Sequence, residues 1–216
     1  MKKYEVLKGI VDIGVVAVIR AKSKAEGVKI IDAVKESGIK AIEVTLTVPN
    51  AVDIIKELTA EYQDELIIGA GTVLDQESAR MCILAGAKYI VSPCFDEETA
   101  KLCNRYVVPY LAGVMTPKEV KTALEFGVPI LKVFPGGAFG PSIIKNFSGP
   151  IPQGSYMPTG GVSVANAQDW IKAGAVAIGA GSVLTKGVVG DDYSSVTTVA
   201  KQLVAEVAKA RKEMEK

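Results

Sequence analysis

The sequence of 216 residues contains no histidine. This absence excludes catalysis by Ser-His-Asp and Cys-His groups, and it removes the imidazole ligands of common zinc and iron sites. We therefore expect no metal site, and we expect no cofactor either. Any proton transfer that the protein performs must use a carboxylate, a lysine, a tyrosine or water.

Cysteine, net charge and long apolar runs are also scarce. Cys82, Cys94 and Cys103 lack C-x-x-C spacing, which indicates neither a disulfide framework nor a thiolate zinc site. With 25 basic and 24 acidic residues, the net charge of +1 gives no general attraction to nucleic acid or to an anionic membrane. The sequence has no apolar run of about 18 residues and no signal-peptide h-region, so we expect a cytoplasmic protein.

Short β-branched runs alternate with segments of helical period. The predicted strands span 15–19, 41–45, 66–70, 89–92, 109–113, 130–134, 155–158 and 177–181. The predicted helices include 24–37, 51–62, 76–85, 116–126, 165–173 and 194–216. Eight such repeats favour an α/β fold, a closed (β/α)8 TIM barrel with an N-terminal helix, over an open doubly wound sheet. The chain is long enough to bury the core of one domain, 1–216.

A helix end, a glycine and an apolar strand recur four times along the chain. The segments are ESGIKAIEV, LAGAKYIVS, EFGVPILKV and KAGAVAIGA, and their glycines are separated by 48, 41 and 47 residues. Each interval corresponds to about two βα units. Glycine is favoured after a helix end because the left-handed backbone conformation costs it nothing.

Lys132 lies in the predicted strand ILKVF, on the face that also carries Ile130 and Phe134. Both faces of a barrel strand are covered, so this lysine must reach the mouth of the barrel or lose its hydration. Burial favours the neutral amine, which can form an imine with a carbonyl group. A lysine that extends to the surface or pairs with a carboxylate explains the same pattern.

Glu43 shares one face of the strand AIEVTLT with Thr45 and Thr47, whereas the opposite face is apolar. The polar face is predicted to line the barrel interior, where carboxylates are uncommon unless paired. Catalytic groups of these barrels lie at the carboxyl ends of the strands. Glu43 is therefore either a general base or a counter-ion for Lys132, and the two interpretations overlap.

Several other groups at predicted strand ends can bind an anion. Arg20 closes the first strand and offers a fork for a carboxylate, although a capping role or a rim salt bridge fits equally. Thr72 follows two glycines in IIGAGTV. The glycine-rich segments PTGGVS at 158–163 and GAGSVLTKG at 179–187 end the last two predicted strands, where backbone N–H groups of such barrels bind phosphate. Simple tight turns would also need these glycines.

The sequence resembles the 2-keto-3-deoxy-6-phosphogluconate / 4-hydroxy-2-oxoglutarate (KDPG/KHG) aldolase family of class I aldolases over almost its full length. The resemblance rests on VVAVIR, IEVTLTVP, IIGAGTVL, YIVSP, GVMTP, ILKVFPG, GPS, MPTGGV and GAGS, in the order and spacing of the family. It implies a Schiff base on Lys132, with Glu43 as the general acid and base, acting partly through water. It implies that Arg20 and Thr72 contact the pyruvate portion of the substrate.

The resemblance also implies a phosphate site formed by Gly160, Gly161, Gly181 and Ser182, further substrate contacts, and a homotrimer. The further substrate-binding residues are Thr47, Pro93, Phe134 and Thr159. Two positions depart from the common pattern of the family. Thr47 stands where many members have arginine, a charge that Arg20 replaces, and Gly137 stands where many members have glutamate after the lysine strand.

The implied activity is the reversible cleavage of 2-keto-3-deoxy-6-phosphogluconate to pyruvate and glyceraldehyde 3-phosphate, in carbohydrate metabolism of the Entner-Doudoroff type. Cleavage of 4-hydroxy-2-oxoglutarate to pyruvate and glyoxylate is expected as well. The alternatives are a 2-keto-3-deoxy-6-phosphogalactonate aldolase, a phosphosugar isomerase or epimerase that uses Glu43 without an imine, and a non-catalytic phosphosugar-binding barrel. Lys132 and Glu43 together argue against the pure binding protein.

Overall fold

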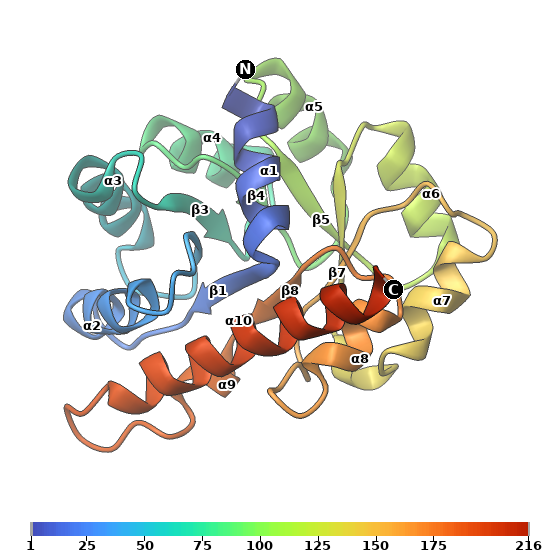
Figure 1. Ribbon diagram of the computed structural model, residues 1–216. Coiled ribbons are helices and arrows are strands. Elements are labelled where there is room, and N and C mark those ends of the chain that lie inside the picture. Colours follow the sequence, from blue (N-terminus) through green and yellow to red (C-terminus); the bar gives the residue numbers. More distant parts are fainter. Residues whose placement is uncertain (1, 216) are drawn as a thin grey trace.

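The computed structural model describes residues 2–215 and contains eight parallel strands arranged as a barrel (Figure 1). The strands are β1 (Val15–Ile19), β2 (Ala41–Thr45), β3 (Ile67–Gly71), β4 (Ile90–Val91), β5 (Tyr110–Val114), β6 (Ile130–Val133), β7 (Tyr156–Pro158) and β8 (Ile178–Ala180). They follow the order β7-β6-β5-β4-β3-β2-β1-β8. Isolated bridges join Tyr156 to Ala175 and Thr159 to Gly179, so the two ends of the sheet meet. The predicted (β/α)8 barrel is confirmed.

Helices follow the strands and surround the barrel. They are α1 (Lys2–Ile13), α2 (Lys24–Lys35), α3 (Ala51–Tyr62), α4 (Gln76–Leu84), α5 (Glu97–Arg105), α6 (Pro117–Glu125), α7 (Ser142–Ser148), α8 (Ala167–Lys172), α9 (Ser182–Thr185) and α10 (Ser194–Met214), with a 3₁₀ turn η1 (Gly136–Ala138). α1 is the predicted N-terminal helix. The end of the predicted last helix at Lys216 lies outside the described residues. No helix between residues 2 and 215 is long and apolar enough to cross a membrane.

The helix boundaries follow local hydrogen bonding. The side chains of Ser23, Asp75, Asp96 and Thr116 accept hydrogen bonds from the first turns of α2, α4, α5 and α6. The four repeated glycines have positive φ values between 73° and 109°, as predicted for residues that end helices: Gly38, Gly86, Gly127 and Gly174. The observed bounds of β1 and β2 match the predicted ones, and the ends of the other strands differ from them by at most one residue. β6, for example, ends at Val133 because Pro135 offers no N–H to the ladder.

Two apolar clusters divide the buried residues. The larger one lies between the strands and the surrounding helices and includes Leu131 and Val133. The smaller one, the interior cluster, fills the amino-terminal half of the barrel with Val6, Ile10, Val16, Ala41, Tyr89, Val91, Leu111, Ile130, Met157 and Ala177. Val6 and Ile10 belong to α1, so this helix covers the amino-terminal end of the barrel (Figure 1).

Arg211 of α10 fixes α1 in this position. Its guanidinium donates hydrogen bonds to the carbonyl oxygens of Val11 and Asp12, at 2.7 Å each, and of Val176, at 2.8 Å. The last carbonyls of a helix lack partners within the helix, so this arginine satisfies the carboxyl end of α1. The amino-terminal end of the barrel is therefore closed, and chemistry is left to the opposite end.

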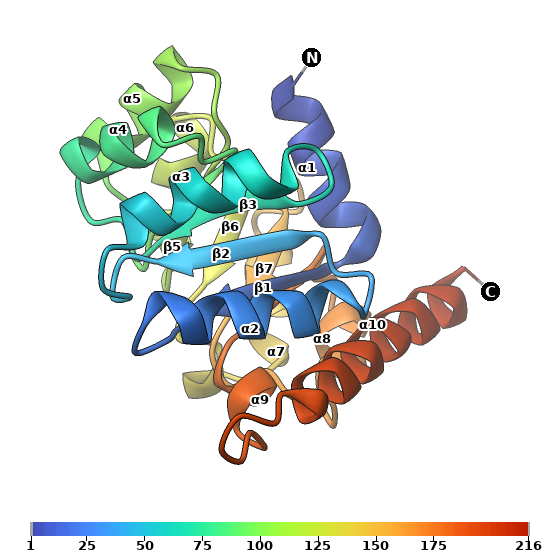
Figure 2. The ribbon, with the colours of Figure 1, turned by 90° about the vertical axis from the view of Figure 1, so that its left-hand side faces the viewer.

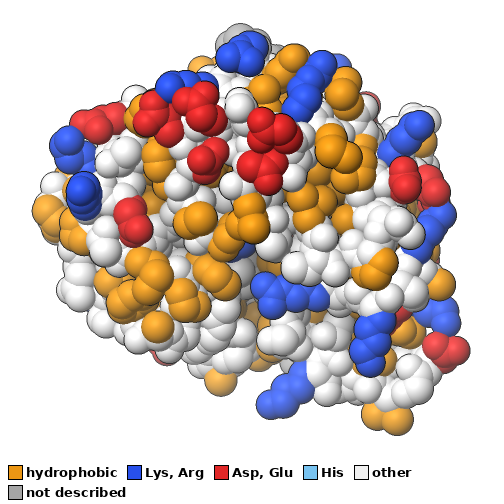
Figure 3. All heavy atoms as spheres, turned by 180° about the vertical axis from the view of Figure 1, so that it is seen from behind, with side chains coloured by type: hydrophobic (Ala, Val, Ile, Leu, Met, Phe, Trp, Pro, Cys, Tyr) orange, Lys and Arg blue, Asp and Glu red, His pale blue; other side chains and the backbone are white. Residues whose placement is uncertain are grey.

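The carboxyl ends of the strands point away from α1. Figure 2 shows β2 running away from α1, with α2 and α3 alongside it. Figure 3 therefore shows the carboxyl-terminal face, where basic side chains lie at the lower centre and acidic ones gather along the upper part. This is the face on which barrels of this kind place their catalytic groups.

Candidate active site

An ion pair between Lys132 and Glu43 spans the barrel interior. Lys132 lies on β6 and Glu43 on β2, so the two side chains come from opposite sides of the barrel. Lys132 Nζ lies 3.3 Å from Glu43 Oε1, and the side chains are 5% and 0% exposed. Such a pair places an amine and a base in contact, out of water. The prediction that Glu43 faces the interior is confirmed, and Lys132 meets it there.

Glycines on the inner faces of the strands create the space for this pair. A Cβ atom added to Gly71 would collide with the carboxylate of Glu43, and one added to Gly179 would collide with the Thr159 side chain. A Cβ atom on Gly113 would collide with the backbone at Pro93. The central layer of the barrel therefore carries polar groups where packed side chains would otherwise fill it.

Phe134 and Thr159 lie at the mouth side of Lys132. The lysine Nζ is 5.3 Å from the centroid of the Phe134 ring, close enough for a cation–π contact. Thr159 is 3% exposed, and its hydroxyl has no hydrogen-bond partner within the described residues. A substrate that reaches Lys132 would pass these two residues.

A cavity of about 70 Å³ opens at the carboxyl ends of β1, β7 and β8. Seven of the predicted site residues line it: Arg20, Phe134, Thr159, Gly160, Gly161, Gly181 and Ser182. Gly160 and Gly161 have φ values of 81° and 74°, and Ser182 begins α9, so backbone N–H groups of both loops lie at this cavity. Arg20 lies on the same wall as these donors. The two glycine loops are thus brought together, and the arrangement suits an anionic group.

Thr72, Thr47 and Pro93 lie around the other side of the mouth, after β3, β2 and β4. Thr72 has a φ of 58°, which is unfavourable for a β-branched residue. The Thr47 hydroxyl is 2.8 Å from that of Thr45, which donates to the Ile19 carbonyl. These three residues do not line the cavity at the glycine loops.

Tyr89 is an interior residue that the sequence analysis did not single out. It is fully buried, and its hydroxyl has no partner within the described residues. Burial, and then the charge of Glu43, raise the pKa of its phenol well above the ordinary value. The sequence did contain a pattern that could have identified it. Alternation places Tyr89 on the same face as Val91 and the predicted site residue Pro93, which is the inner face of the strand.

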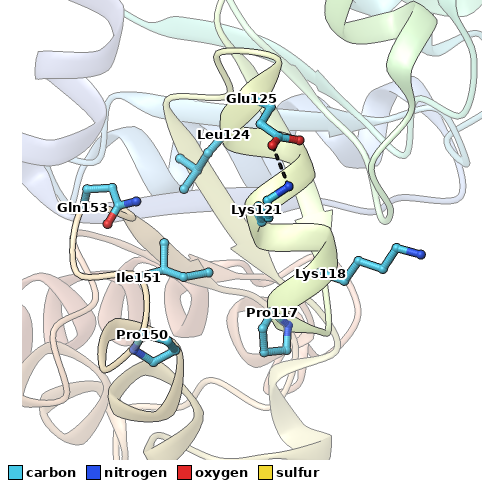
Figure 4. Close-up of a pocket in the computed structure, with 8 residues that line it drawn as sticks. All are labelled: Pro117, Lys118, Lys121, Leu124, Glu125, Pro150, Ile151 and Gln153. Carbon is cyan, nitrogen blue, oxygen red and sulfur yellow. Dashed lines mark ion pairs between the residues drawn. The ribbon is translucent and has the colours of Figure 1, made fainter.

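A larger hollow of about 700 Å³ lies outside the barrel, between α6 and residues 150–153 (Figure 4). It is lined by Pro117, Lys118, Lys121, Leu124, Glu125, Pro150, Ile151 and Gln153. Its lysine at position 121 forms a surface ion pair with Glu125 at 2.7 Å. None of these residues is a buried charged group, so the chemistry lies at the barrel mouth and not in the larger hollow.

The chain matches known proteins over most of its length. Residues 7–199 match the family model described as KDPG and KHG aldolase. The KHG/KDPG aldolase of Escherichia coli K12 is 32% identical over 193 residues, which cover 88% of this chain and 90% of that protein. The 2-dehydro-3-deoxy-6-phosphogalactonate aldolase of the same strain is 34% identical over 170 residues, 78% of this chain and 83% of that protein.

A solved structure extends the comparison. KDPG aldolase from Legionella pneumophila, with pyruvate captured at low pH as a covalent carbinolamine intermediate, aligns with a TM-score of 0.83 and 27% identity. The alignment covers 90% of this chain and 97% of that chain. The fold and these relatives define the class: the protein is a (β/α)8-barrel aldolase, a carbon–carbon lyase. It belongs to the KDPG and KHG aldolase family.

Proposed function

We propose that the protein is a class I aldolase that forms a Schiff base through Lys132 and cleaves 2-keto-3-deoxy-6-phosphogluconate. The observation that carries the proposal is the buried contact of 3.3 Å between Lys132 Nζ and Glu43 Oε1. Transfer of the lysine proton to Glu43 leaves a neutral amine, which is the form that attacks a carbonyl group. We propose that residues 1–216 form one catalytic domain.

The reaction begins when Lys132 Nζ attacks C2 of the keto acid, and loss of water leaves a protonated imine. Glu43 removes the proton of the C4 hydroxyl, directly or through water. The C3–C4 bond breaks, its electron pair moves into the imine to give an enamine, and the aldehyde leaves. Protonation at C3 and hydrolysis of the imine release pyruvate and the free lysine.

The two ends of the substrate are anionic, and the mouth of the barrel offers donors for both. We assign the phosphate to the N–H groups of Gly160, Gly161 and Ser182. Arg20 contributes positive charge at the same cavity. Thr72 and Pro93 lie across the mouth and are assigned to the pyruvate portion, with Phe134 packed beside the lysine.

The activity is tested by release of pyruvate, measured with lactate dehydrogenase and NADH. We expect turnover of 2-keto-3-deoxy-6-phosphogluconate and, less efficiently, of 4-hydroxy-2-oxoglutarate. A second substrate is included because a 2-dehydro-3-deoxy-6-phosphogalactonate aldolase is 34% identical to this chain. A larger kcat/KM for that galactonate would make it the physiological substrate. If the protein isomerises or binds these substrates but releases no pyruvate, the proposal is wrong.

Ser182→Asp is expected to weaken cleavage of the phosphorylated substrate much more than cleavage of 4-hydroxy-2-oxoglutarate. A carboxylate at this position would lie where the phosphate dianion binds, and like charges repel. The measurement is kcat/KM for both substrates, because this ratio reports differential transition-state binding. Ser182→Asn is the matched control, similar in shape and uncharged. Equal losses for both substrates would show that the loops shape the pocket without binding phosphate.

We also propose that the protein is a cytoplasmic homotrimer, as its family resemblance implies. A surface on and around α4 and α5 exposes large apolar side chains: Leu74, Met81, Leu84, Tyr106 and Val107. Several exposed large apolar side chains on neighbouring helices are typical of an interface. Native mass spectrometry should show three chains, and Leu84→Asp should shift the population to monomer. A monomeric wild-type protein at micromolar concentration would contradict this assignment.

A further inference from the structure

Tyr89 carries a polar group into the apolar half of the barrel. Its side chain is fully buried and belongs to the interior cluster with Val16, Leu111 and Ile130. Its hydroxyl has no hydrogen-bond partner among residues 2–215. Phenylalanine would fill the same volume without burying an unpaired donor, so the hydroxyl requires a physical reason.

The phenol end of Tyr89 is directed at the strand beside Glu43. A Cβ atom added to Gly69 would collide with Cε1 and Cζ of the tyrosine ring, and Cζ is the carbon that bears the hydroxyl. Gly69 is the residue of β3 that pairs with Glu43 of β2. The missing side chain of Gly69 therefore lets the phenol lie over β3, beside the strand that carries Glu43.

Glu43 has a free acceptor to meet this donor. Its Oε1 atom contacts Lys132, whereas Oε2 is buried and has no hydrogen-bond partner in the described part of the chain. The raised pKa of Tyr89 keeps its proton in place, so the phenol is a donor at any working pH. A buried donor and a buried acceptor are thus both without a partner, and the charge of Glu43 acts on the phenol. One water between them would satisfy both groups.

We propose that Tyr89 is a positioning residue, whose hydroxyl holds the Glu43 carboxylate, through one bridging water, in the orientation that moves protons at the substrate. This inference rests on the proposed role of Glu43 as the general base. A carboxylate held at Oε2 by Tyr89 and at Oε1 by Lys132 cannot rotate freely. Such orientation of the base by a third group is a recurring requirement of activated pairs.

The test compares Tyr89→Phe with the wild-type enzyme in the exchange of pyruvate methyl protons for deuterium, followed by proton NMR. We expect kcat for exchange to fall about 10- to 100-fold, the range for loss of one hydrogen bond to a charged group. KM for pyruvate and the rate of borohydride trapping on Lys132 should stay unchanged, because Tyr89→Phe leaves the contact between Lys132 and Glu43 Oε1 in place.

Tyr156→Phe is the matched control. Its hydroxyl donates to the Ile151 carbonyl at 3.0 Å, outside the interior cluster, so removing it should leave exchange as in wild type. Exchange by Tyr89→Phe within twofold of wild type would overturn the proposal. Slower trapping, a higher KM and a lower melting temperature alongside the slower exchange would overturn it too, because that pattern shows a purely structural role.

A double variant shows whether Tyr89 acts through Glu43. If it does, adding Tyr89→Phe to Glu43→Gln should not slow the residual exchange further. A further tenfold loss would mean that the tyrosine acts independently, and the positioning role would be wrong. Failure of the wild-type enzyme to trap pyruvate would instead refute the Schiff-base proposal, so the two failures are distinguishable.

Discussion

Incubation with pyruvate and borohydride is expected to attach one reduced adduct per chain, at Lys132, and to inactivate the enzyme. Borohydride reduces the imine to a stable secondary amine, so the intact mass increases by one carboxyethyl group. Lys132→Ala should show neither the adduct nor turnover. An unchanged mass at saturating pyruvate would disprove the class I mechanism, and chelators should have no effect on any of these results.

Lys132→Arg separates the chemistry of the lysine from its charge. Alanine leaves Glu43 buried without its partner, which costs about 3–5 kcal/mol and complicates the comparison. Arginine keeps the positive charge, but a guanidinium does not form the imine. We expect this variant to lose turnover and trapping. Lys118→Arg, on the exposed side of α6, is the control that should retain both.

Glu43→Gln is expected to depress deuterium exchange at the pyruvate methyl group by about two to four orders of magnitude, the usual range for loss of a general base. Glu43 is the only buried carboxylate among residues 2–215, and the sequence has no histidine to replace it. The measurement is proton NMR in deuterium oxide, with trapping on Lys132 followed in parallel.

The control for this variant is Glu125→Gln on α6, which removes a carboxylate from a surface ion pair. Its exchange rate should equal that of wild type, because exposed pairs contribute little. Wild-type exchange by Glu43→Gln would show that the glutamate is a counter-ion only. The glycine loops would then remain a binding site without an assigned base.

Alternation along the strand made the inward direction of Glu43 predictable from the sequence, but not that of Lys132. Each strand places successive side chains on opposite faces, and the apolar Ile42 and Val44 identified the outer face of the Glu43 strand. Both faces of the Lys132 strand are apolar, so its pattern does not identify the inner one. The sequence could not predict that the two groups meet at 3.3 Å. That distance depends on closure of the barrel, which brings β2 and β6 opposite each other only in three dimensions.

Other features could not be predicted from the sequence, either because they depend on neighbouring strands or because they are too short. The unpaired hydroxyl of Tyr89 becomes visible only when β3 supplies Gly69 beside it. The short helices α7 and α9 carry too few residues for a periodic pattern. Arg20 was assigned to pyruvate through the family resemblance, and the structure places it on the wall that the glycine loops share.

The glycines inside the barrel have a consequence for enzyme design. Gly69, Gly71, Gly113 and Gly179 carry no functional group, and each occupies a position where a methyl group would collide with a neighbour. Grafting a lysine and a glutamate onto opposite strands of another eight-stranded barrel would therefore not reproduce this site. The host barrel must first lose side-chain volume on the intervening strands. A scaffold for a designed aldolase is therefore chosen for glycines on its inner face before the lysine and glutamate are introduced.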